Sequence, residues 1–384
     1  MRGTVIRRGT SYSVVLDLGR GPDGKRVRHW HSGYRTKRDA ERARVDLLAK
    51  LDAGLYVDPS RLTVAEYLRQ WLEHVEQARA GATHQRYEYI VGRYLLPHLG
   101  SVRLQQLQPF HVQQTYDLLL ERGGRDGRPL APGTVALIHR ILRRALKQAV
   151  RWQLVARNVC EQVDLPAAPR GRPAGLDPEQ ARVLLDHARS AGGWLWAFVA
   201  LGVATGCRRG ELLALRWSDV DLDQGAAAVR RSLGLVRGQL VYSPPKTDAG
   251  DRTLELPAFA LAMLRRRRAE QAELRLVLGA AYDTAADLIV CREDGSALRP
   301  DYVTHRFKRL VHDAGLPTQV HVHGMRHGFA SLLAEQGEGP AAIAEVLGHA
   351  DRGQLALRVY IRPAATAAAR AAAKIEQAFG GDDR

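Results

Sequence analysis

The chain has 384 residues, of which 45% are hydrophobic, and its 57 Lys and Arg against 41 Asp and Glu give a formal net charge of +16. This length predicts two or three domains, each able to bury a core. So large a positive charge indicates a polyanionic partner, with nucleic acid first and an anionic membrane surface second. The membrane is disfavoured, because no run approaches the roughly 20 apolar residues that span a bilayer. The opening residues also lack the apolar core of a secretion signal.

The cysteines Cys160, Cys207 and Cys291 are far apart and odd in number. Their spacing supports neither a disulfide framework nor a cysteine-rich zinc site. We therefore expect a reducing, cytoplasmic setting.

Residues 1–58 are expected to form a small β-rich unit. "SYSVVLDL" alternates between apolar and polar residues, and "VRHWHSGY" can return as a second strand after a glycine-rich turn. A helix is predicted to start at Thr36 and to end at a glycine. The unit holds 13 Lys or Arg against 7 Asp or Glu. This excess favours contact with DNA over a merely solvated face.

Residues 62–163 are predicted to form a bundle of four or five helices. The first helix opens with Thr63 as N-cap and Glu66 three residues later, the spacing of a capping box. The second is expected to stop near Pro97, and the last begins at Pro132. Basic residues line one flank of that last helix: Arg140, Arg143, Arg144, Lys147 and Arg151. We expect this flank to face backbone phosphates, although plain solubility is the alternative.

The segment 164–176 is rich in Pro, Gly and Arg and is predicted to be an extended, basic linker. Residues 177–384 form the largest expected domain, which opens with Asp177 as the N-cap of a helix. Helices dominate it, and a nearly all-apolar one should be buried. Three short strands of a small antiparallel sheet are expected at 226–232, 239–245 and 252–257.

Several charged residues of this domain fall where the pattern predicts burial. Arg208 and Glu211 lie three apart at the start of a helix and therefore share a face. A cation is unfavourable at a helix start unless an anion binds there, although a simple Arg208–Glu211 ion pair is the alternative. Lys246 follows a Pro-Pro pair in the turn between two predicted strands. Such a lysine is either solvated or carried on a mobile hairpin tip into a groove.

Further polar groups follow toward the end of the domain. His323 and Arg326 have the i, i+3 spacing that aims both at one point near a helix start, where anions bind. Metal binding is disfavoured, because His321 and His323 are not four apart and no nearby Cys or carboxylate completes a site. His349 follows a glycine that ends a helix, and Tyr360 lies about ten residues on between two arginines. A lone tyrosine is usually a core or interface residue, but flanking cations ease ionisation of a phenol.

Together these positions supply two arginines, a lysine, two histidines and a hydroxyl nucleophile in one domain of a strongly basic protein. Such a set suits attack on a phosphodiester without a metal, since fixed cations and donors stabilise the charge of a pentacoordinate phosphorus. Arginine suits this task because its guanidinium is planar and permanently charged.

The order of these motifs resembles the tyrosine recombinase (phage integrase) family: "TGCRRGE", "PPKTD", "HGMRH", "LGH" and "RVY". The resemblance covers residues 62 to about 380, and residues 1–58 resemble the small arm-binding domain of many integrases. It implies a multidomain α+β fold. A small sheet with a helix at 1–58 precedes a helical, SAM-like core-binding domain at 62–163. After the linker 164–176 comes a mostly helical catalytic domain at 177–384 with a small three-stranded antiparallel sheet.

The resemblance also implies a role for each site residue. Tyr360 is the nucleophile that forms a 3′-phosphotyrosyl link, and Glu211 braces the Arg208 loop. The other implied catalytic residues are Arg208 and Arg326 as phosphate ligands, His323 in proton transfer, His349 as a phosphate donor and Lys246 as the acid for the leaving 5′-hydroxyl. Neither a metal nor another cofactor nor ATP is implied.

The resemblance implies that the protein acts on double-stranded DNA with core and arm attachment sites and forms a homotetramer on that DNA. It also implies an accessory excisionase and DNA-bending proteins as partners, and a location in the bacterial cytoplasm with the nucleoid. Cys207 and Met325 replace aliphatic residues common in the family, and the loop from His349 to Tyr360 is slightly long. The leading function is an integrase of a phage or integrative element. The alternatives are a chromosomal dimer-resolving recombinase, a type IB topoisomerase and a non-catalytic DNA-binding relative.

Overall fold

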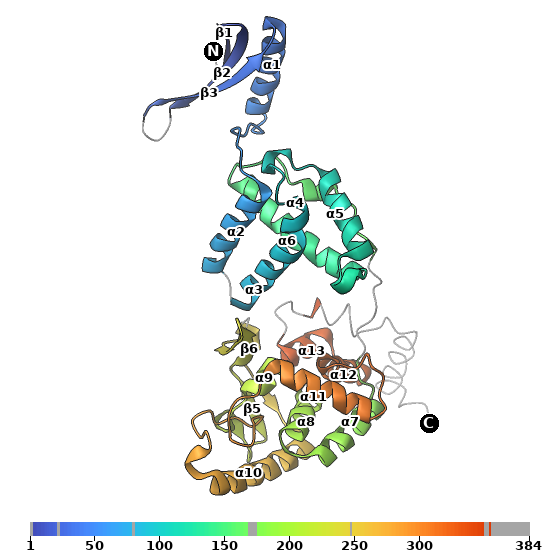
Figure 1. Cartoon of the computed structure of the whole chain (residues 1–384). Helices are drawn as coiled ribbons and strands as arrows, with labels where there is room; N and C mark the ends of the chain where they lie inside the picture. Colours follow the sequence, from blue (N-terminus) through green and yellow to red (C-terminus); the bar gives the residue numbers. More distant parts are fainter. Residues whose placement is uncertain are drawn as a thin grey trace, which may run out of the picture. The chain divides into compact units, whose positions relative to one another are not determined.

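The computed structural model describes residues 3–20, 24–78, 81–167, 175–245, 248–348 and 353–354. The chain divides into two compact units, Met1–Pro169 and Arg170–Arg384. Figure 1 colours the elements of both units along the sequence.

The first unit begins with an antiparallel sheet in the order β1-β2-β3 and a helix packed on it: β1 (Gly3–Arg8), β2 (Ser11–Arg20), β3 (Arg26–Tyr34) and α1 (Lys37–Asp52). Thr36 caps the helix as predicted, accepting the Asp39 N–H at 3.1 Å. Val14 and Leu16 of β2 are fully buried with Ala40 of α1. Because side chains alternate along a strand, the opposite face, which carries Trp30, is turned away from α1.

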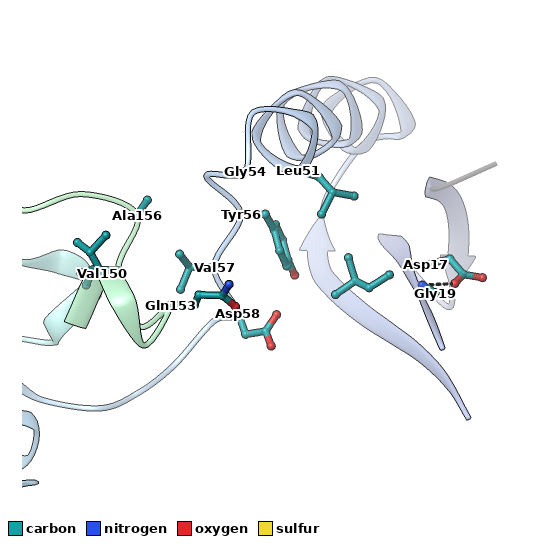
Figure 2. A pocket seen from close by; sticks show the side chains of 12 residues that line it. Asp17, Gly19, Leu51, Gly54, Tyr56, Val57, Asp58, Val150, Gln153 and Ala156 are labelled. Atoms are coloured by element: carbon teal, nitrogen blue, oxygen red, sulfur yellow. Dashed lines mark hydrogen bonds between the residues drawn. The ribbon is translucent and has the colours of Figure 1, made fainter. Parts of the chain in front are cut away.

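The segment after α1 returns to β3. The hydroxyl of Tyr56 lies 3.0 Å from Nδ1 of His29 and 3.1 Å from Nε2 of His31. His29 also lies 2.5 Å from the carboxylate of Asp58. Burial, with a further contribution from Asp58, raises the pKa of Tyr56 to about 12, so its hydroxyl keeps its proton. Figure 2 shows Tyr56 and Asp58 among the side chains that line a cavity of about 720 Å³ beside this segment.

Helices form the rest of the first unit: α2 (Val64–Ala78), α3 (Gly81–Ile90), the π-helix η1 (Val91–Leu95), α4 (Leu96–Leu99), α5 (Pro109–Arg122) and α6 (Pro132–Arg151), with 3-10 turns η2 (Leu104–Gln106), η3 (Arg125–Gly127) and η4 (Val159–Gln162). The predicted capping box of α2 is present, since Thr63 Oγ1 accepts from the Glu66 N–H at 3.2 Å and Glu66 accepts from the Thr63 N–H at 2.8 Å. The core centres on Tyr67, Trp71 and Tyr116.

The second predicted helix ends close to Pro97, as expected, at Leu99 two residues beyond it. Residues 81–99 run on as α3, η1 and α4, with Pro97 in the first turn of α4. A proline normally ends a helix, because it has no N–H to donate and its ring crowds the carbonyl four residues earlier. Here the wider π-helical turn before Pro97 interrupts the regular pattern of backbone hydrogen bonds, so the proline can be accommodated. The chain therefore remains helical up to Leu99, which is buried.

The basic flank of α6 is exposed at all five positions, opposite the buried face with Ile138 and Leu142. Arg144, Lys147 and Arg151 also line a cavity of about 340 Å³ with Trp71 and His74. Arg143 lies 3.5 Å from Glu161 and Arg144 donates to Tyr87, but both side chains stay exposed, so the flank can still meet an anion.

The predicted linker ends in the second unit. Residues 168–174 lie outside the described chain, but the Leu176 N–H donates to the Gly324 carbonyl at 3.3 Å and the side chain is 5% exposed. Gly175 permits this approach, because a Cβ there would lie 3.0 Å from the Gly328 nitrogen. The extended prediction missed Leu176 because a single apolar residue gives no periodic signal.

The second unit is mostly helical, with α7 (Pro178–Ala191), α8 (Gly193–Thr205), α9 (Arg209–Ala214), α10 (Ala258–Leu278), α11 (Pro300–Asp313), α12 (Val322–Glu335) and α13 (Pro340–Leu347). Its short strands are β4 (Val220–Asp221), β5 (Ala226–Val229), β6 (Ser232–Val236), β7 (Gln239–Ser243) and β8 (Arg252–Glu255), with 3-10 turns η5 (Trp217–Asp219), η6 (Asp248–Gly250) and η7 (Gly279–Ala281). The apolar α8 is buried over most of its length, as expected.

A small three-stranded antiparallel sheet is present, but its strands pair differently from the prediction. Its order is β4-β5-β8, whereas β7 pairs with β6 in a separate hairpin. Arg237 and Gly238, both at positive φ, form the two-residue turn that closes this hairpin. The segment containing Lys246 therefore joins two sheets, and the expected hairpin tip between adjacent strands is wrong.

Across the part of the chain that the structure describes, no helix is both long and apolar enough to cross a membrane.

The threonine N-caps of α1 and α2 give a test of the local fold. Thr63→Ala removes the acceptor at the start of α2 and should cost about 1 kcal/mol there, which is about fivefold faster amide exchange over residues 64–70. Hydrogen exchange measured by mass spectrometry on the full chain checks this. Thr36→Ala is the matched control and should speed exchange in α1 alone. Equal acceleration of both helices by either variant would contradict a local role.

Candidate active site

The site begins where α8 ends and α9 starts. Gly206 has φ +61° and ends α8, and a Cβ there would lie 2.7 Å from Phe329 and 2.9 Å from Leu347. Only glycine fits this crowded left-handed position. The tight turn places Arg208 at the N-cap of α9, as the sequence predicted.

Arg208 is held by Glu211 on the next turn. Its Nη1 donates to Glu211 Oε1 at 2.7 Å, and its backbone N–H donates to Glu211 Oε2 at 2.9 Å. The Glu211 side chain is 3% exposed, whereas that of Arg208 is 42% exposed. The Arg208–Glu211 ion pair, which the sequence offered as the alternative to anion binding, is therefore present. It fixes one side of the Arg208 guanidinium and leaves another side open to a ligand.

Arg326 lies on α12 and reaches the same place. Its Nη1 donates to the Gly206 carbonyl at 3.0 Å and its Nη2 to the Leu347 carbonyl at 2.7 Å. It is 2% exposed, so the guanidinium is satisfied by carbonyl oxygens and not by water. Burial first, and then the charge of Arg208, lower the pKa of Arg326 to about 10, which still leaves it charged at neutral pH.

The two guanidinium groups meet at the end of α13. Arg208 Nη2 donates to the Gly348 carbonyl at 3.3 Å, next to the Leu347 carbonyl that accepts from Arg326. α12 and α13 lie against each other (Figure 1), and the side chains of Arg326 on α12 and Arg208 at the start of α9 both reach the end of α13. Free carbonyls at a helix C-terminus carry partial negative charge, which offsets the repulsion between the cations. The predicted convergence of Arg208 and Arg326 is thus seen in the structure.

A third arginine, Arg252 at the start of β8, completes the cluster and was missed by sequence reasoning. Its Nη2 donates to Glu211 Oε2 at 3.0 Å and its Nε to the Val346 carbonyl at 2.8 Å. The signal was available: Arg252 and the buried Leu254 are two apart on a strand and therefore face the same side. We call Arg208, Arg252 and Arg326 the arginine cluster.

Glu211 is the carboxylate at the centre of this cluster. Burial acts to raise its pKa, but the charge of Arg252 and the hydrogen bonds from Arg208 and Arg252 outweigh burial, so the pKa is lowered. Glu211 therefore stays ionised at neutral pH. Three guanidinium groups and one carboxylate leave this small volume with an excess of positive charge. Such a site favours an anion.

His323 lies in the first turn of α12, one turn before Arg326. Its ring packs edge-on against the ring of His327 at 4.5 Å and lies 6.5 Å from that of His321. Burial first, then the charges of Arg326, His321 and Arg208, lower the pKa of His323. The neutral ring can therefore accept a proton beside the cluster. Within the described ranges, no group of three or more His, Cys, Asp or Glu side chains could hold a metal ion.

Lys246, His349 and Tyr360 lie outside the described residues. Described residues close in sequence to Lys246 and to His349 do lie against each other. A Cβ on Gly348 would lie 2.7 Å from the Ala249 carbonyl and 3.3 Å from Gly250. The turn that follows Lys246 in the sequence therefore packs against the residue that precedes His349.

Three family models match the chain. The phage integrase family covers residues 175–366, half of the chain. A phage integrase N-terminal SAM-like domain covers residues 63–120, and an arm DNA-binding domain covers residues 5–51.

Curated relatives agree with these matches. The chain is 26% identical over 359 residues to a protein named "Tyrosine recombinase XerC-like" from Caldanaerobacter subterraneus subsp. tengcongensis, with 88% of this chain and 89% of the relative covered. It is 28% identical over 343 residues to an "Integrase" of Streptomyces ambofaciens, with 88% and 85% covered.

Solved structures show the same fold. An integrase of the Tn1549 transposon in complex with a circular intermediate DNA matches with a TM-score of 0.68 at 19% identity, over 82% of this chain and 99% of that one. A lambda integrase bound to a core site matches with a TM-score of 0.56 at 18% identity, over 94% of both chains. With these matches and the converging arginines, the chain belongs to the phage integrase family and is a site-specific tyrosine recombinase, an enzyme that cleaves and rejoins DNA.

Proposed function

We propose that this recombinase is the integrase of a phage or integrative mobile element. The catalytic residues of the proposal are Tyr360 as nucleophile, Arg208, Arg326 and His349 as phosphate ligands, His323 as proton acceptor and Lys246 as proton donor. The observation that carries the proposal is the meeting of the Arg208 and Arg326 guanidinium groups at adjacent carbonyls, beside a neutral His323.

The proposed reaction exchanges one phosphoester for another. The Tyr360 oxygen attacks the scissile phosphorus and loses its proton to His323, while the bond to the 5′-oxygen breaks and that oxygen takes a proton from Lys246. Arg208 and Arg326 neutralise charge on the non-bridging oxygens as the phosphorus becomes pentacoordinate. The covalent 3′-phosphotyrosyl link keeps the bond energy, so a second 5′-hydroxyl can reverse the reaction without ATP.

The domains of the proposal are an arm-binding domain at 1–58, a core-binding domain at 62–163, a basic linker at 164–176 and a catalytic domain at 177–384. The arm and SAM-like family matches at 5–51 and 63–120 support the first two. The exposed basic flank of α6 supplies cations for phosphates of the core site.

The proposed partners are double-stranded DNA at core and arm sites and a homotetramer on that DNA, with an excisionase and DNA-bending proteins as accessory factors. Similarity to a lambda integrase tetramer bound to a Holliday junction, with a TM-score of 0.55, supports this assembly. We place the protein in the bacterial cytoplasm with the nucleoid, where its DNA substrate lies.

A chromosomal dimer-resolving recombinase is the second candidate, favoured by the relative named XerC-like. The match of an arm DNA-binding domain to residues 5–51 favours the integrase. Sequencing the DNA that flanks the gene separates the two, since an integrase predicts element junctions nearby.

Tyr360→Phe tests the chemistry. The wild-type chain should become trapped on a nicked duplex carrying the element's junction sequence, because the nick releases a short strand that cannot return. The variant lacks the attacking oxygen and should give no adduct on denaturing gels while binding the same DNA. Tyr302→Phe, at a partly exposed tyrosine of α11, is the matched control and should trap normally. An adduct of undiminished yield in Tyr360→Phe would refute the assignment.

The lowered pKa of His323 sets a pH dependence. Because the pKa of His323 lies below its ordinary value of 6.5, the ring is mostly neutral at pH 6.5 and above, and the midpoint of its protonation falls at a more acidic pH. Because the proton acceptor must be neutral, we expect single-turnover cleavage by saturating enzyme to hold from roughly pH 8 down to roughly 6.5 and to decline in more acidic buffer. In His323→Gln the rate should be low and this acid decline absent. A decline centred above pH 6.5 in the wild-type chain would contradict the proposed role.

The open face of the N-terminal sheet gives a test of arm binding. Trp30 is 46% exposed there, with the Arg8 guanidinium 4.9 Å from its ring. Trp30→Ala should weaken binding to DNA from outside the core site about tenfold, without changing cleavage at the core. Val45→Ala, at a position of α1 that is 59% exposed, is the control and should bind normally. Equal affinities of the two variants, measured by fluorescence anisotropy, would place the arm surface elsewhere.

A further inference from the structure

The Arg252 guanidinium makes more hydrogen bonds than a single ion pair with Glu211 would provide. It is the first residue of β8 and its side chain is 7% exposed. Besides Glu211 and the Val346 carbonyl, it donates through Nη1 to the Gly250 carbonyl at 3.2 Å and through Nη2 to Cys207 Sγ at 3.5 Å. Burial raises the pKa of Cys207 to about 11, so its sulfur is a neutral acceptor. One planar guanidinium thus serves four residues on three segments of the chain, which are 207–211, the turn η6 and α13.

Those three segments are the ones that carry the proposed active site. Glu211 holds Arg208, and Val346 lies in the last turn of α13, whose following carbonyls accept from Arg326 and Arg208. Gly250 ends the turn η6, which follows Lys246 in the sequence. Arg252 itself makes no hydrogen bond to Arg208 or Arg326, and any effect it has on them passes through the groups they share.

A buried arginine on α10 shows what a purely structural role looks like in the same unit. Arg267 is 3% exposed, donates to the carbonyls of Ile289 and Cys291, and pairs with Glu270. Its environment matches that of Arg252 in burial, carbonyl partners and a carboxylate. Among the described residues, the hydrogen bonds and the ion pair of Arg267 reach none of the partners of Arg208 and Arg326, so it provides a matched control.

We propose that Arg252 is a positioning residue for strand cleavage, which holds the Glu211–Arg208 pair, the end of α13 and the turn after Lys246 in one fixed arrangement. The inference rests on the proposed function of Arg208 and Arg326. Full activity needs the planar fork, because an ammonium cannot donate at once in the fixed directions that Glu211, Val346 and Gly250 require. Arg252 acts before the reaction, because it keeps Arg208 and Arg326 in the positions from which they bind the phosphate.

The test compares Arg252→Met, Arg252→Lys and Arg267→Met in the full chain. DNA affinity and the rate of adduct formation at saturating enzyme are measured separately on the nicked junction duplex, below the melting temperature of every variant. We expect Arg252→Met to bind normally and to cleave about 100-fold more slowly, since a displacement of about 1 Å costs that much. Arg252→Lys keeps the charge near Glu211 and should recover to about tenfold below wild type. Arg267→Met should melt earlier and cleave normally.

A double-mutant cycle with Glu211→Gln separates action through Glu211 from general damage. If Arg252 acts through this carboxylate, Arg252→Met should slow cleavage far less in the Glu211→Gln background than in the wild type. Additive losses, or equal slowing by Arg267→Met, would overturn the inference. If Arg252→Met does not fold, wild-type cleavage by Arg252→Lys would overturn it. A wild-type chain that forms no Tyr360-dependent adduct would instead overturn the proposed function, and this inference with it.

Discussion

The carbonyl end of α13 is the feature on which the rest of the site depends. The carbonyls of residues 346–348 accept hydrogen bonds from Arg252, Arg326 and Arg208, in that order. The last carbonyls of a helix have no partner within it, and they carry partial negative charge. They can therefore gather three cations that would otherwise repel one another. Three segments distant in sequence are fixed at this one point.

This arrangement explains why so much positive charge can be buried in a small volume. Glu211 supplies the only full negative charge among the described residues that bond to the arginine cluster. The remaining compensation comes from carbonyl dipoles, which are neutral groups. The site as a whole keeps a positive excess, and Arg208 keeps part of its side chain exposed to present that charge. A backbone phosphate is an anion that can complete the balance.

Much of this could be predicted from the sequence, and the rest could not for identifiable reasons. The Arg208–Glu211 pair and the shared face of His323 and Arg326 follow from helical spacing, which is local. The pairing of β6 with β7 depends on a turn whose Arg-Gly sequence is a weak hairpin signal. The role of Arg252 depends on contacts with α9 and α13 that no local pattern encodes. The assignments of Lys246, His349 and Tyr360 remain predictions from the family resemblance.

We propose that Arg208 and Arg326 act together on the charge of one phosphate. Cleavage of a junction duplex whose scissile phosphate is replaced by an uncharged methylphosphonate tests it most directly, because this substrate removes the charge that the arginines neutralise. If both guanidinium groups neutralise this charge, Arg208→Ala and Arg326→Ala, which are both defective on the natural phosphate, should recover cleavage on the methylphosphonate. If neither variant recovers, or if only one does, the two guanidinium groups do not share a phosphate.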